Sequence, residues 1–434
     1  MPKKNILSEE DQLKQDILNT EEKKWYYSDK YQKIEEKVKQ SLVSQKTDEA
    51  LEDITIGALV LWSSDVHYDG YKDYVQVRFR IDGILVDIFR LNHREYDLVK
   101  ERLKYSSSLK LNITNIPQDG KYSLEIQEKK LDVRVSTLPI KYTENIVCRI
   151  LDNSNTNVTF DELWFFWTSK RMLQRAITKR NGMILVTGPT GSWKTTTLYT
   201  ILEELNTRDK KIITLEDPIE YELDWIIQSE VNEKNGFTFE TGLKSLLRQD
   251  PDIIMVWEIR WLSTLQTATS ASLTWHLVMS TLHTKSAADT LDRIINMWLP
   301  PYILASALDT IIAQRLVRKI CPHCKEEKIK TPAEQHLITQ MMTSIWMPEI
   351  LSNKIKLYHG IGCSKCNNSW YAWRIGVYEI ISLNDKLREI IRAGWSVSQV
   401  IEEARIGDLI TMKEDWVLKA IRWYTTIEEI LRVM

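Results

Sequence analysis

Between residues 182 and 284, short apolar runs alternate with longer amphipathic stretches. The runs GMILVTG, KIITLE, DIIMV and HLVMSTLHT are typical of buried strands. The stretch TTLYTILEEL has apolar residues spaced by three and four, which predicts a helix. Strands that alternate with helices form mostly parallel sheets with helices on both faces. The pattern therefore predicts an α/β core in the middle of the chain.

The pattern is different on both sides of this region. Residues 1–50 are polar and charged with weak helical periodicity, which predicts a solvated helical arm. Residues 51–151 contain short alternating strands such as YVQVRFRIDGILVDI, and DNSNTNVTF after them has the composition of a linker. The last 55 or so residues have a helical pattern, with a capping box from Thr426 to Glu429.

Composition narrows the class of protein. A chain of 434 residues is long enough for two or three domains, and its 43% apolar and 27% charged residues are ordinary for a soluble globular protein. The net charge of −2 gives no electrostatic reason to expect a nucleic-acid partner. No apolar run approaches the roughly 18 residues that span a bilayer, and no export signal is present. We expect a cytoplasmic protein that reaches a membrane only through partners.

The stretch GPTGSWKTT lies between a predicted strand and a predicted helix. It matches G-x-x-x-x-G-K-[ST], in which backbone N–H groups cradle nucleotide phosphates, except that tryptophan stands at the second glycine. In this pattern the lysine reaches the β- and γ-phosphates and the threonine holds Mg²⁺. The candidate ATP-binding residues are Gly188, Pro189, Thr190, Gly191, Ser192, Trp193, Lys194, Thr195 and Thr196.

Acidic residues follow two of the predicted strands. Glu258 comes after DIIMV, where a carboxylate can orient an attacking water directly or through the Mg²⁺ shell. LEDPIEY adds Glu216, Asp217 and Glu220 after another strand. Any one of these acids taken alone is as easily explained as a helix cap or a solvated loop charge, but beside a phosphate loop they favour catalysis. His276 and His283 flank the strand in WHLVMSTLHT, where a lone histidine is more often structural.

Four cysteines form two C-x-x-C pairs. Cys321 and Cys324 are separated from Cys363 and Cys366 by 38 residues, a spacing that favours a tetrahedral Zn²⁺ site over free buried thiols. Cys148 lies on an apolar strand, and we expect it in the core.

From about residue 55 to the end, the chain resembles the secretion ATPases of type II secretion and type IV pilus assembly. SSDVHYD, RFRIDGIL, PQDGKYS and DVRVSTLP resemble that family's first domain, and GPTGSWKT its Walker A loop. TLEDPIEY is similar to its aspartate box, LRQDPDIIMVWEIR to its Walker B segment and SLTWHLVMSTLHT to its histidine box. The four cysteines followed by RIGVYEI fit the assembly and secretion branch, since retraction motors usually lack the zinc element.

The resemblance implies a RecA-like P-loop NTPase core, preceded by a smaller α/β (PAS-like) domain and followed by a zinc-binding insertion and a helical region. It implies a homo-hexameric ring that hydrolyses ATP with Mg²⁺, and the ATP would be held between the first domain and the core. The ring would drive pilin or pseudopilin assembly through an inner-membrane platform protein. Members usually carry a longer amino-terminal docking domain than residues 1–50. We expect an arm (1–50), an α/β domain (51–155), the ATPase core (156–318), a zinc element (319–380) and a helical region (381–434).

The resemblance also assigns roles to single residues. Glu258 is expected as a catalytic carboxylate and Glu216 as a second acidic contributor. His283 is expected as a phosphate sensor, and Arg134 and Arg149 fall where the family places basic residues that face the triphosphate. No direct nucleic-acid partner is expected, although a motor for DNA uptake or conjugation shares the same core chemistry and stays an alternative.

The glycine and tryptophan contents are both abnormal. There are 14 glycines, about 3% of the chain against a usual 7% or so, and 16 tryptophans. The family has glycine at several of the tryptophan positions, and Trp164 and Trp225 are expected to belong with them. Those positions are Trp193, Trp257, Trp275, Trp298, Trp370, Trp373, Trp416 and Trp423.

Random decay would not direct so many changes to one residue type, whereas a translation convention would. UGA is read as tryptophan in one variant code and as glycine in another. We therefore hypothesise that the source reads UGA as glycine, while some tryptophans, such as Trp25 or Trp346, are genuine. If Trp193 is literal, its indole obstructs the phosphate site, and a catalytically inactive ring subunit or scaffold becomes the alternative function.

Overall fold

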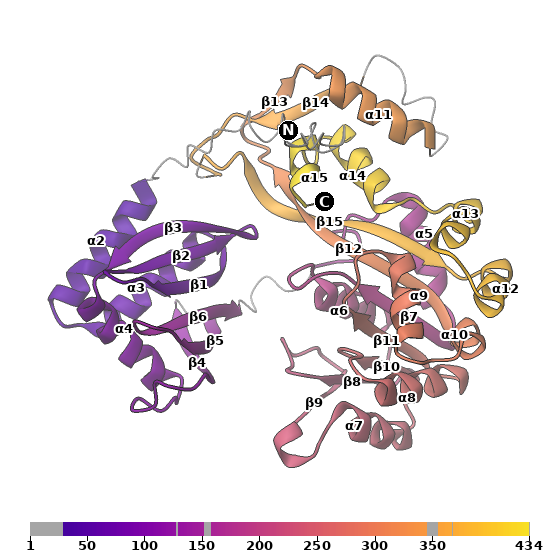
Figure 1. Ribbon diagram of the computed structural model, residues 1–434, viewed down its shortest axis with the longest axis horizontal. Helices are drawn as coiled ribbons and strands as arrows, with labels where there is room; N and C mark the ends of the chain where they lie inside the picture. The colour runs from indigo at the N-terminus through magenta and orange to yellow at the C-terminus, as the bar shows by residue number, and fades with distance from the viewer. Residues whose placement is uncertain (1–28, 127–128, 152–157, 345–354, 367, 434) are drawn as a thin grey trace, which may run out of the picture. The chain divides into compact units, whose positions relative to one another are not determined.

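The computed structural model describes residues 29–126, 129–151, 158–344, 355–366 and 368–433 (Figure 1). They form two compact units. The amino-terminal unit takes the described residues of 29–151 together with 368–369, and the core unit takes the described residues of 158–366 and 370–433. Trp25, Trp346 and most of the expected linker lie outside the described residues.

The amino-terminal unit is a six-stranded antiparallel sheet in the order β3-β2-β1-β6-β5-β4, with three helices (Figure 1). Its hydrophobic core combines alternate residues of the strands with the inner faces of the helices. The strands are β1 (Ser63–Gly70), β2 (Val75–Ile81), β3 (Ile84–Leu91), β4 (Gln118–Ile126), β5 (Lys129–Pro139) and β6 (Glu144–Leu151). The helices are α2 (Asp29–Val43), α3 (Thr47–Val60) and α4 (His93–Ser106).

The expectation of a solvated arm is wrong for the part of residues 1–50 that the structure describes. Helix α2 buries Tyr31, Ile34, Val38 and Leu42 in the core of the amino-terminal unit. These side chains recur at spacings of three and four, so they share one face of the helix. Because these four apolar residues stand among many charged ones, the composition of the segment did not indicate a packed helix.

The core unit contains a seven-stranded sheet in the order β15-β12-β7-β11-β10-β8-β9. Every neighbouring pair from β12 to β9 is parallel, and only β15 pairs antiparallel, which confirms the predicted mostly parallel α/β core. The strands are β7 (Gly182–Thr187), β8 (Ile212–Glu216), β9 (Ile227–Glu230), β10 (Ile253–Val256), β11 (Leu277–Leu282), β12 (Leu308–Ile320) and β15 (Tyr371–Ser382).

Helices cover both faces of this sheet (Figure 1). Alternate residues of β7 enter two different hydrophobic clusters, Met183 and Leu185 in one and Ile184 and Val186 in the other. Burial on both faces explains why the strands read as unbroken apolar runs. One cluster includes α7 (Phe239–Leu246), α8 (Leu262–Leu273) and α9 (Ala287–Asn296), and the other includes α5 (Trp167–Ile177) and α6 (Lys194–Leu205).

The remaining elements of the core unit include a small two-stranded sheet and a run of helices. The predicted carboxyl-terminal helices are present, and the Glu429 N–H donates to the Thr426 hydroxyl at 3.2 Å, as in the predicted capping box. These elements are α10 (Pro301–Ala307), β13 (Lys325–Lys328), α11 (Pro332–Ser344), β14 (Leu357–Gly360), α12 (Asp385–Ala393), α13 (Val397–Ile406), α14 (Met412–Ile421) and α15 (Ile427–Val433).

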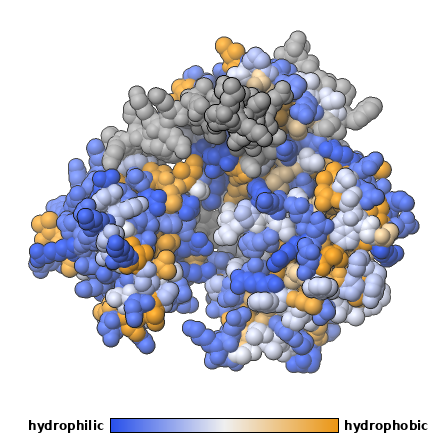
Figure 2. All heavy atoms as spheres, in the orientation of Figure 1, coloured by the Kyte–Doolittle hydropathy of each residue, from blue (hydrophilic) through white to orange (hydrophobic). Residues whose placement is uncertain are grey.

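The face of the molecule in Figure 2 is mostly hydrophilic, with hydrophobic residues in small separate groups. Within the part of the chain that the structure describes, no helix has both the length and the apolar character that a membrane crossing needs.

Candidate functional site

The stretch 188–196 connects the buried strand β7 to helix α6, as the sequence predicted. Gly188 begins it with φ of 153°, and a Cβ there would stand 2.3 Å from the backbone oxygen of Gln314. Only glycine tolerates both this dihedral and this close approach. The Ser192 hydroxyl donates to the Pro189 carbonyl at 2.8 Å, which closes the loop on itself. The backbone geometry is that of a phosphate-binding loop.

Gln314 on β12 holds the loop and was not found by sequence reasoning. Its side chain is fully buried, and its amide donates to the Ser192 carbonyl. Its Oε1 accepts from the Thr197 hydroxyl at 2.9 Å. One amide therefore ties β12 both to the loop and to the first turn of α6. The signal in the sequence is a lone glutamine inside the apolar run IIAQRLV, where an unpaired amide would be costly.

Lys194, at the start of α6, folds back over the loop. Its Nζ donates to the carbonyls of Gly188 at 3.0 Å and Pro189 at 3.1 Å. Burial lowers the pKa of Lys194 to about 8, and the nearby Glu258 carboxylate opposes that shift. The ammonium is thus only partly satisfied electrostatically, and a phosphate group would complete its neutralisation.

Two tryptophans occupy positions where the loop has little room. Trp193 is the N-cap of α6 with φ of 64° and ψ of 30°, a left-handed conformation that is a genuine outlier for a bulky residue. Its ring lies against Trp373, with centroids 6.0 Å apart. The Trp257 indole N–H donates to the Thr195 hydroxyl at 3.1 Å. That hydroxyl is the group that the motif assigns to Mg²⁺.

Glu258 and His283 meet at the carboxyl ends of neighbouring parallel strands. Glu258 follows β10 and His283 follows β11, and His283 Nε2 lies 3.4 Å from Glu258 Oε1. Arg260 donates to the other carboxylate oxygen at 2.8 Å. Burial and the charge of Lys194 lower the pKa of His283, so the imidazole is mostly neutral at pH 7. Lys194, Glu258 and His283 therefore form one electrostatic group beside the loop.

The segment after His283 is fixed by two side chains that sequence reasoning did not identify. The Thr284 N–H donates to the hydroxyl of Thr187, the last residue of β7, at 2.9 Å. Glu379 of β15 accepts from the N–H of Ala287, where α9 begins, at 2.8 Å. The same carboxylate accepts from the N–H of Met412, the first residue of α14, at 3.3 Å.

Glu216 lies at the end of β8 and is fully buried. Its carboxylate accepts hydrogen bonds from the hydroxyls of Tyr199 and Thr214 and from the Gln228 amide. Burial raises its pKa, and the three donors oppose that shift. Its hydrogen-bond partners among the described residues come from α6, β8 and β9, and none is Lys194, Glu258 or His283.

Arg134 and Arg149 belong to the amino-terminal unit. They face each other directly across the β5–β6 pair. The Arg149 Nε donates to Asp65 at 2.8 Å, and Arg80 lies 3.4 Å from the same carboxylate. The Arg149 side chain is 53% exposed, which leaves much of its guanidinium accessible to solvent.

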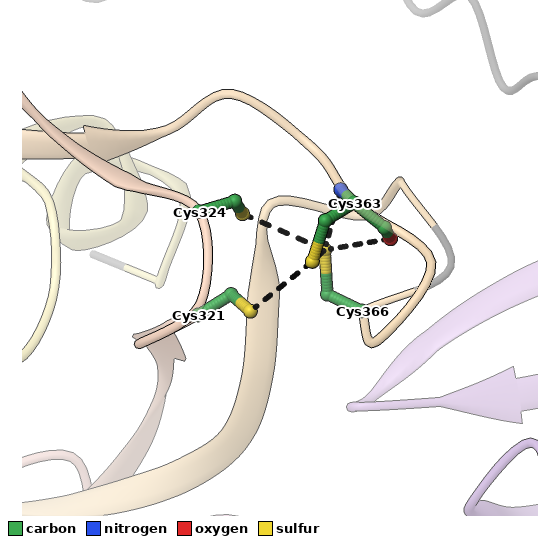
Figure 3. Close-up of side chains that lie close together, drawn as sticks. All are labelled: Cys321, Cys324, Cys363 and Cys366. Carbon is green, nitrogen blue, oxygen red and sulfur yellow. Dashed lines mark hydrogen bonds between the residues drawn. The ribbon is translucent and has the colours of Figure 1, made fainter.

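The four cysteines of the C-x-x-C pairs converge, with their sulfur atoms pointing toward one another (Figure 3). Cys321 and Cys324 come from the turn between β12 and β13, and Cys363 and Cys366 from the loop after β14. All four sulfur atoms lie within 4.8 Å of one another, and three of the separations are 3.7–3.8 Å.

This spacing fits zinc. Zn–S bonds of about 2.3 Å place tetrahedral sulfur atoms about 3.8 Å apart. A backbone N–H lowers the pKa of the Cys363 thiol to about 7, which favours the thiolate that binds metal. Cys148 lies apart, buried in the amino-terminal unit as expected.

The sequence profile of the family described as "Type II/IV secretion system protein" matches residues 38–432. Type II secretion system protein E of Aeromonas hydrophila is 39% identical over 374 residues, covering 86% of this chain and 72% of that protein. Type IV pilus assembly ATPase PilB of Pseudomonas aeruginosa is 41% identical over 372 residues, covering 86% of this chain and 64% of that protein.

Solved structures support the same fold. The ATPase DotB of Legionella pneumophila superposes with a TM-score of 0.61 at 20% identity, covering 87% of this chain and 93% of that one. The pilus retraction motor PilT with bound ADP superposes with a TM-score of 0.56 at 24% identity, covering 88% of this chain and 95% of that one. With the family match across nearly the whole chain and relatives near 40% identity, this protein is a secretion ATPase that belongs to the type II/IV secretion system protein family.

Proposed function

We propose that the chain forms a homo-hexameric ring that hydrolyses ATP to drive pilin or pseudopilin assembly through an inner-membrane platform protein. The observation that carries the catalytic part is the grouping of Lys194, Glu258 and His283 beside the loop that joins β7 to α6. The names of the relatives support both a secretion and a pilus machine.

The loop residues take the roles that the phosphate-loop chemistry requires. Backbone N–H groups of 188–196 bind phosphate oxygens, Lys194 pairs with the β- and γ-phosphates, and Thr195 holds Mg²⁺ through its hydroxyl. The half-buried Lys194 ammonium already turns toward the loop carbonyls and would exchange these neutral partners for a phosphate.

Glu258 and His283 act on the terminal phosphate. Glu258 orients the attacking water, and His283, 3.4 Å from that carboxylate, reports whether the γ-phosphate is present. Arg260 donates to the other carboxylate oxygen at 2.8 Å and so fixes the orientation of Glu258, whose two oxygens keep acceptor sites for a water molecule.

Glu216, Arg134 and Arg149 have supporting roles in the proposal. Glu216 is the second acidic contributor, and its hydrogen bond from Tyr199 favours a positioning role through α6, the helix that begins at the loop. Arg134 and Arg149, which pair across β5 and β6, take the role of the basic residues that face the triphosphate in the family.

Two bound groups besides ATP belong to the proposal. The Thr195 hydroxyl would hold Mg²⁺, which would neutralise phosphate charge there. Zn²⁺ is held by Cys321, Cys324, Cys363 and Cys366 and stabilises the element between β12 and β15. The protein works in the cytoplasm at the inner membrane, docked through its partner and without direct nucleic-acid contact.

A second function is favoured by one observation. With an indole at position 193 and another on the Thr195 hydroxyl, the chain as written has an obstructed phosphate site. A protein with those side chains would serve as a non-hydrolysing ring subunit or scaffold.

The test is ATP hydrolysis by protein that carries glycine at positions 193 and 257. We expect turnover that Glu258→Gln abolishes while nucleotide binding persists, and that the matched control Glu389→Gln, on an exposed surface, leaves unchanged. Sedimentation with nucleotide should give a hexamer. Absence of turnover in the parent protein would contradict the motor and favour the scaffold.

A further inference from the structure

The tryptophans of this chain are concentrated in a backbone conformation that bulky residues avoid. Of the sixteen, fourteen lie within the described residues, and nine of these have φ between 57° and 74°. Only a few per cent of non-glycine residues adopt positive φ, and those are mostly Asn and Asp. The nine are Trp62, Trp164, Trp193, Trp225, Trp275, Trp298, Trp370, Trp373 and Trp423.

Four of the nine stand where helices end. Trp62, Trp275, Trp298 and Trp423 each follow the C-cap residue of a helix, the position at which glycine is the usual residue. After α9 the Trp298 N–H donates to Ile295, and the next N–H donates to Ile294. These two hydrogen bonds complete a Schellman motif.

Helix α14 ends in the same way. The Trp423 N–H donates to the Ala420 carbonyl at 3.0 Å, and the Tyr424 N–H donates to the Lys419 carbonyl at 3.0 Å. Two helices thus end in a motif whose left-handed residue is normally glycine and is here tryptophan.

Two further positions lie beside the cysteines. Trp373 has φ of 74° inside β15, where the register against β12 slips between Arg318 and Ile320. A left-handed residue in such a bulge is normally glycine. Trp370 also has positive φ, and a Cβ at Gly360 would stand 2.3 Å from its carbonyl oxygen.

The indoles of this group contribute little packing. Seven of the nine are exposed, and Trp225, Trp275 and Trp298 are 78–84% exposed. Among the other described tryptophans, Trp395 packs against the core and donates its indole N–H to Asp292 at 3.1 Å. Trp164 is the exception, because its ring packs against the core and lies 4.8 Å from the ring of Tyr424. The assignment of the set to glycine therefore rests on the backbone conformation.

We propose that these nine positions are glycine in the native polypeptide, because the source translates UGA as glycine. The backbone adds Trp62 to the positions expected from sequence, and it makes no assignment at Trp257 and Trp416, whose φ is not positive. At position 193 the inference deepens the proposed function, since it removes the obstruction of the phosphate loop. Only this consequence rests on the proposed function.

The decisive experiment is peptide mass spectrometry of the protein isolated from its source. We expect each peptide that spans one of the nine positions to have the mass for glycine, and the codons there to be UGA. Tryptophan-containing peptides, or UGG codons, at these positions would overturn the proposal. This measurement reads the residue whatever the ATPase activity, so its failure is distinct from failure of the proposed function.

A recombinant comparison gives an independent readout. Thermal unfolding compares the recombinant protein that has tryptophan at these positions with the triple variant Trp275→Gly, Trp298→Gly, Trp423→Gly. Trp395→Gly serves as the matched control. We expect the triple variant to melt at a higher temperature and the control at a lower one. A triple variant that melts at or below the parent temperature would contradict the assignment.

Discussion

The phosphate loop and the tetracysteine cluster are built by opposite means. The loop is made by the backbone, and it depends on residues that lack Cβ at Gly188 and at position 193. The cluster is made by four side chains, whose sulfur atoms converge from two separate turns. Tryptophan in place of glycine at position 193 therefore obstructs the first site but leaves the four sulfur atoms of the second in place.

The largest effect that separates the two sites is expected from Lys194→Ala. Without the ammonium, the negative charge that develops on the phosphate loses a positive partner, so kcat/KM for ATP should fall about 100-fold or more. Zinc content should stay at one ion per chain. Steady-state kinetics and metal analysis check both, with the exposed Lys386→Ala as control; a loss of zinc would show that the sites are not independent.

The converse change is Cys324→Ser, which removes one of the four sulfur ligands. We expect zinc to be lost and the segment between β12 and β15 to become sensitive to protease, because structural zinc contributes folding energy directly. Cys148→Ser, in the amino-terminal unit, should keep the metal. Retention of stoichiometric zinc by the Cys324 variant would refute the ligand set.

A smaller effect is expected where β12 supports the loop. Gln314→Met keeps the volume but removes both hydrogen bonds, leaving the Ser192 carbonyl without that donor. Unsatisfied buried groups cost about 1–3 kcal/mol, so nucleotide affinity should fall about tenfold. Gln314→Glu keeps the acceptor for Thr197 but turns a buried carboxylate oxygen toward the Ser192 carbonyl, so its affinity should fall at least as far as that of the Met variant. An unchanged affinity at reduced melting temperature would instead assign Gln314 to general stability.

The smallest effect is a pH dependence of the loop alone. The pKa of Lys194 is lowered to about 8, so the ammonium that attracts phosphate loses its proton as pH rises through that value. Nucleotide affinity of the free enzyme should therefore weaken above about pH 8 and be constant between pH 7 and 7.5. Titration by isothermal calorimetry measures it. Lys194→Arg, whose charge persists to higher pH, should remove the dependence.

Sequence patterns predicted the parts of the molecule that depend on local chemistry. The strands of the core sheet were visible as apolar runs because both faces are buried, and the four cysteines were visible because two C-x-x-C pairs form a recognisable spacing. Glu258 and His283 were singled out separately, through the family resemblance, and their contact after neighbouring strands comes from the structure.

The features that the sequence did not predict mostly depend on contacts between segments that are far apart in the chain. The burial of Tyr31 and Val38 in α2 requires a sheet that is assembled later in the chain. Gln314 lies more than a hundred residues from the loop it holds, and a single buried glutamine has no spacing to mark it. Trp62 was missed because nothing in its sequence context fixes where α3 ends, whereas its backbone does.

Glu379 has a consequence that extends beyond holding a segment in place. One carboxylate closes the beginnings of both α9 and α14, and α9 starts four residues after His283. Ala287 bonds one oxygen of this carboxylate and Met412 bonds the other, so a single side chain joins the starts of two helices that lie far apart in the sequence. The carboxylate therefore cross-links the segment that follows His283 to the start of α14, the way a staple joins two sheets of paper at one point.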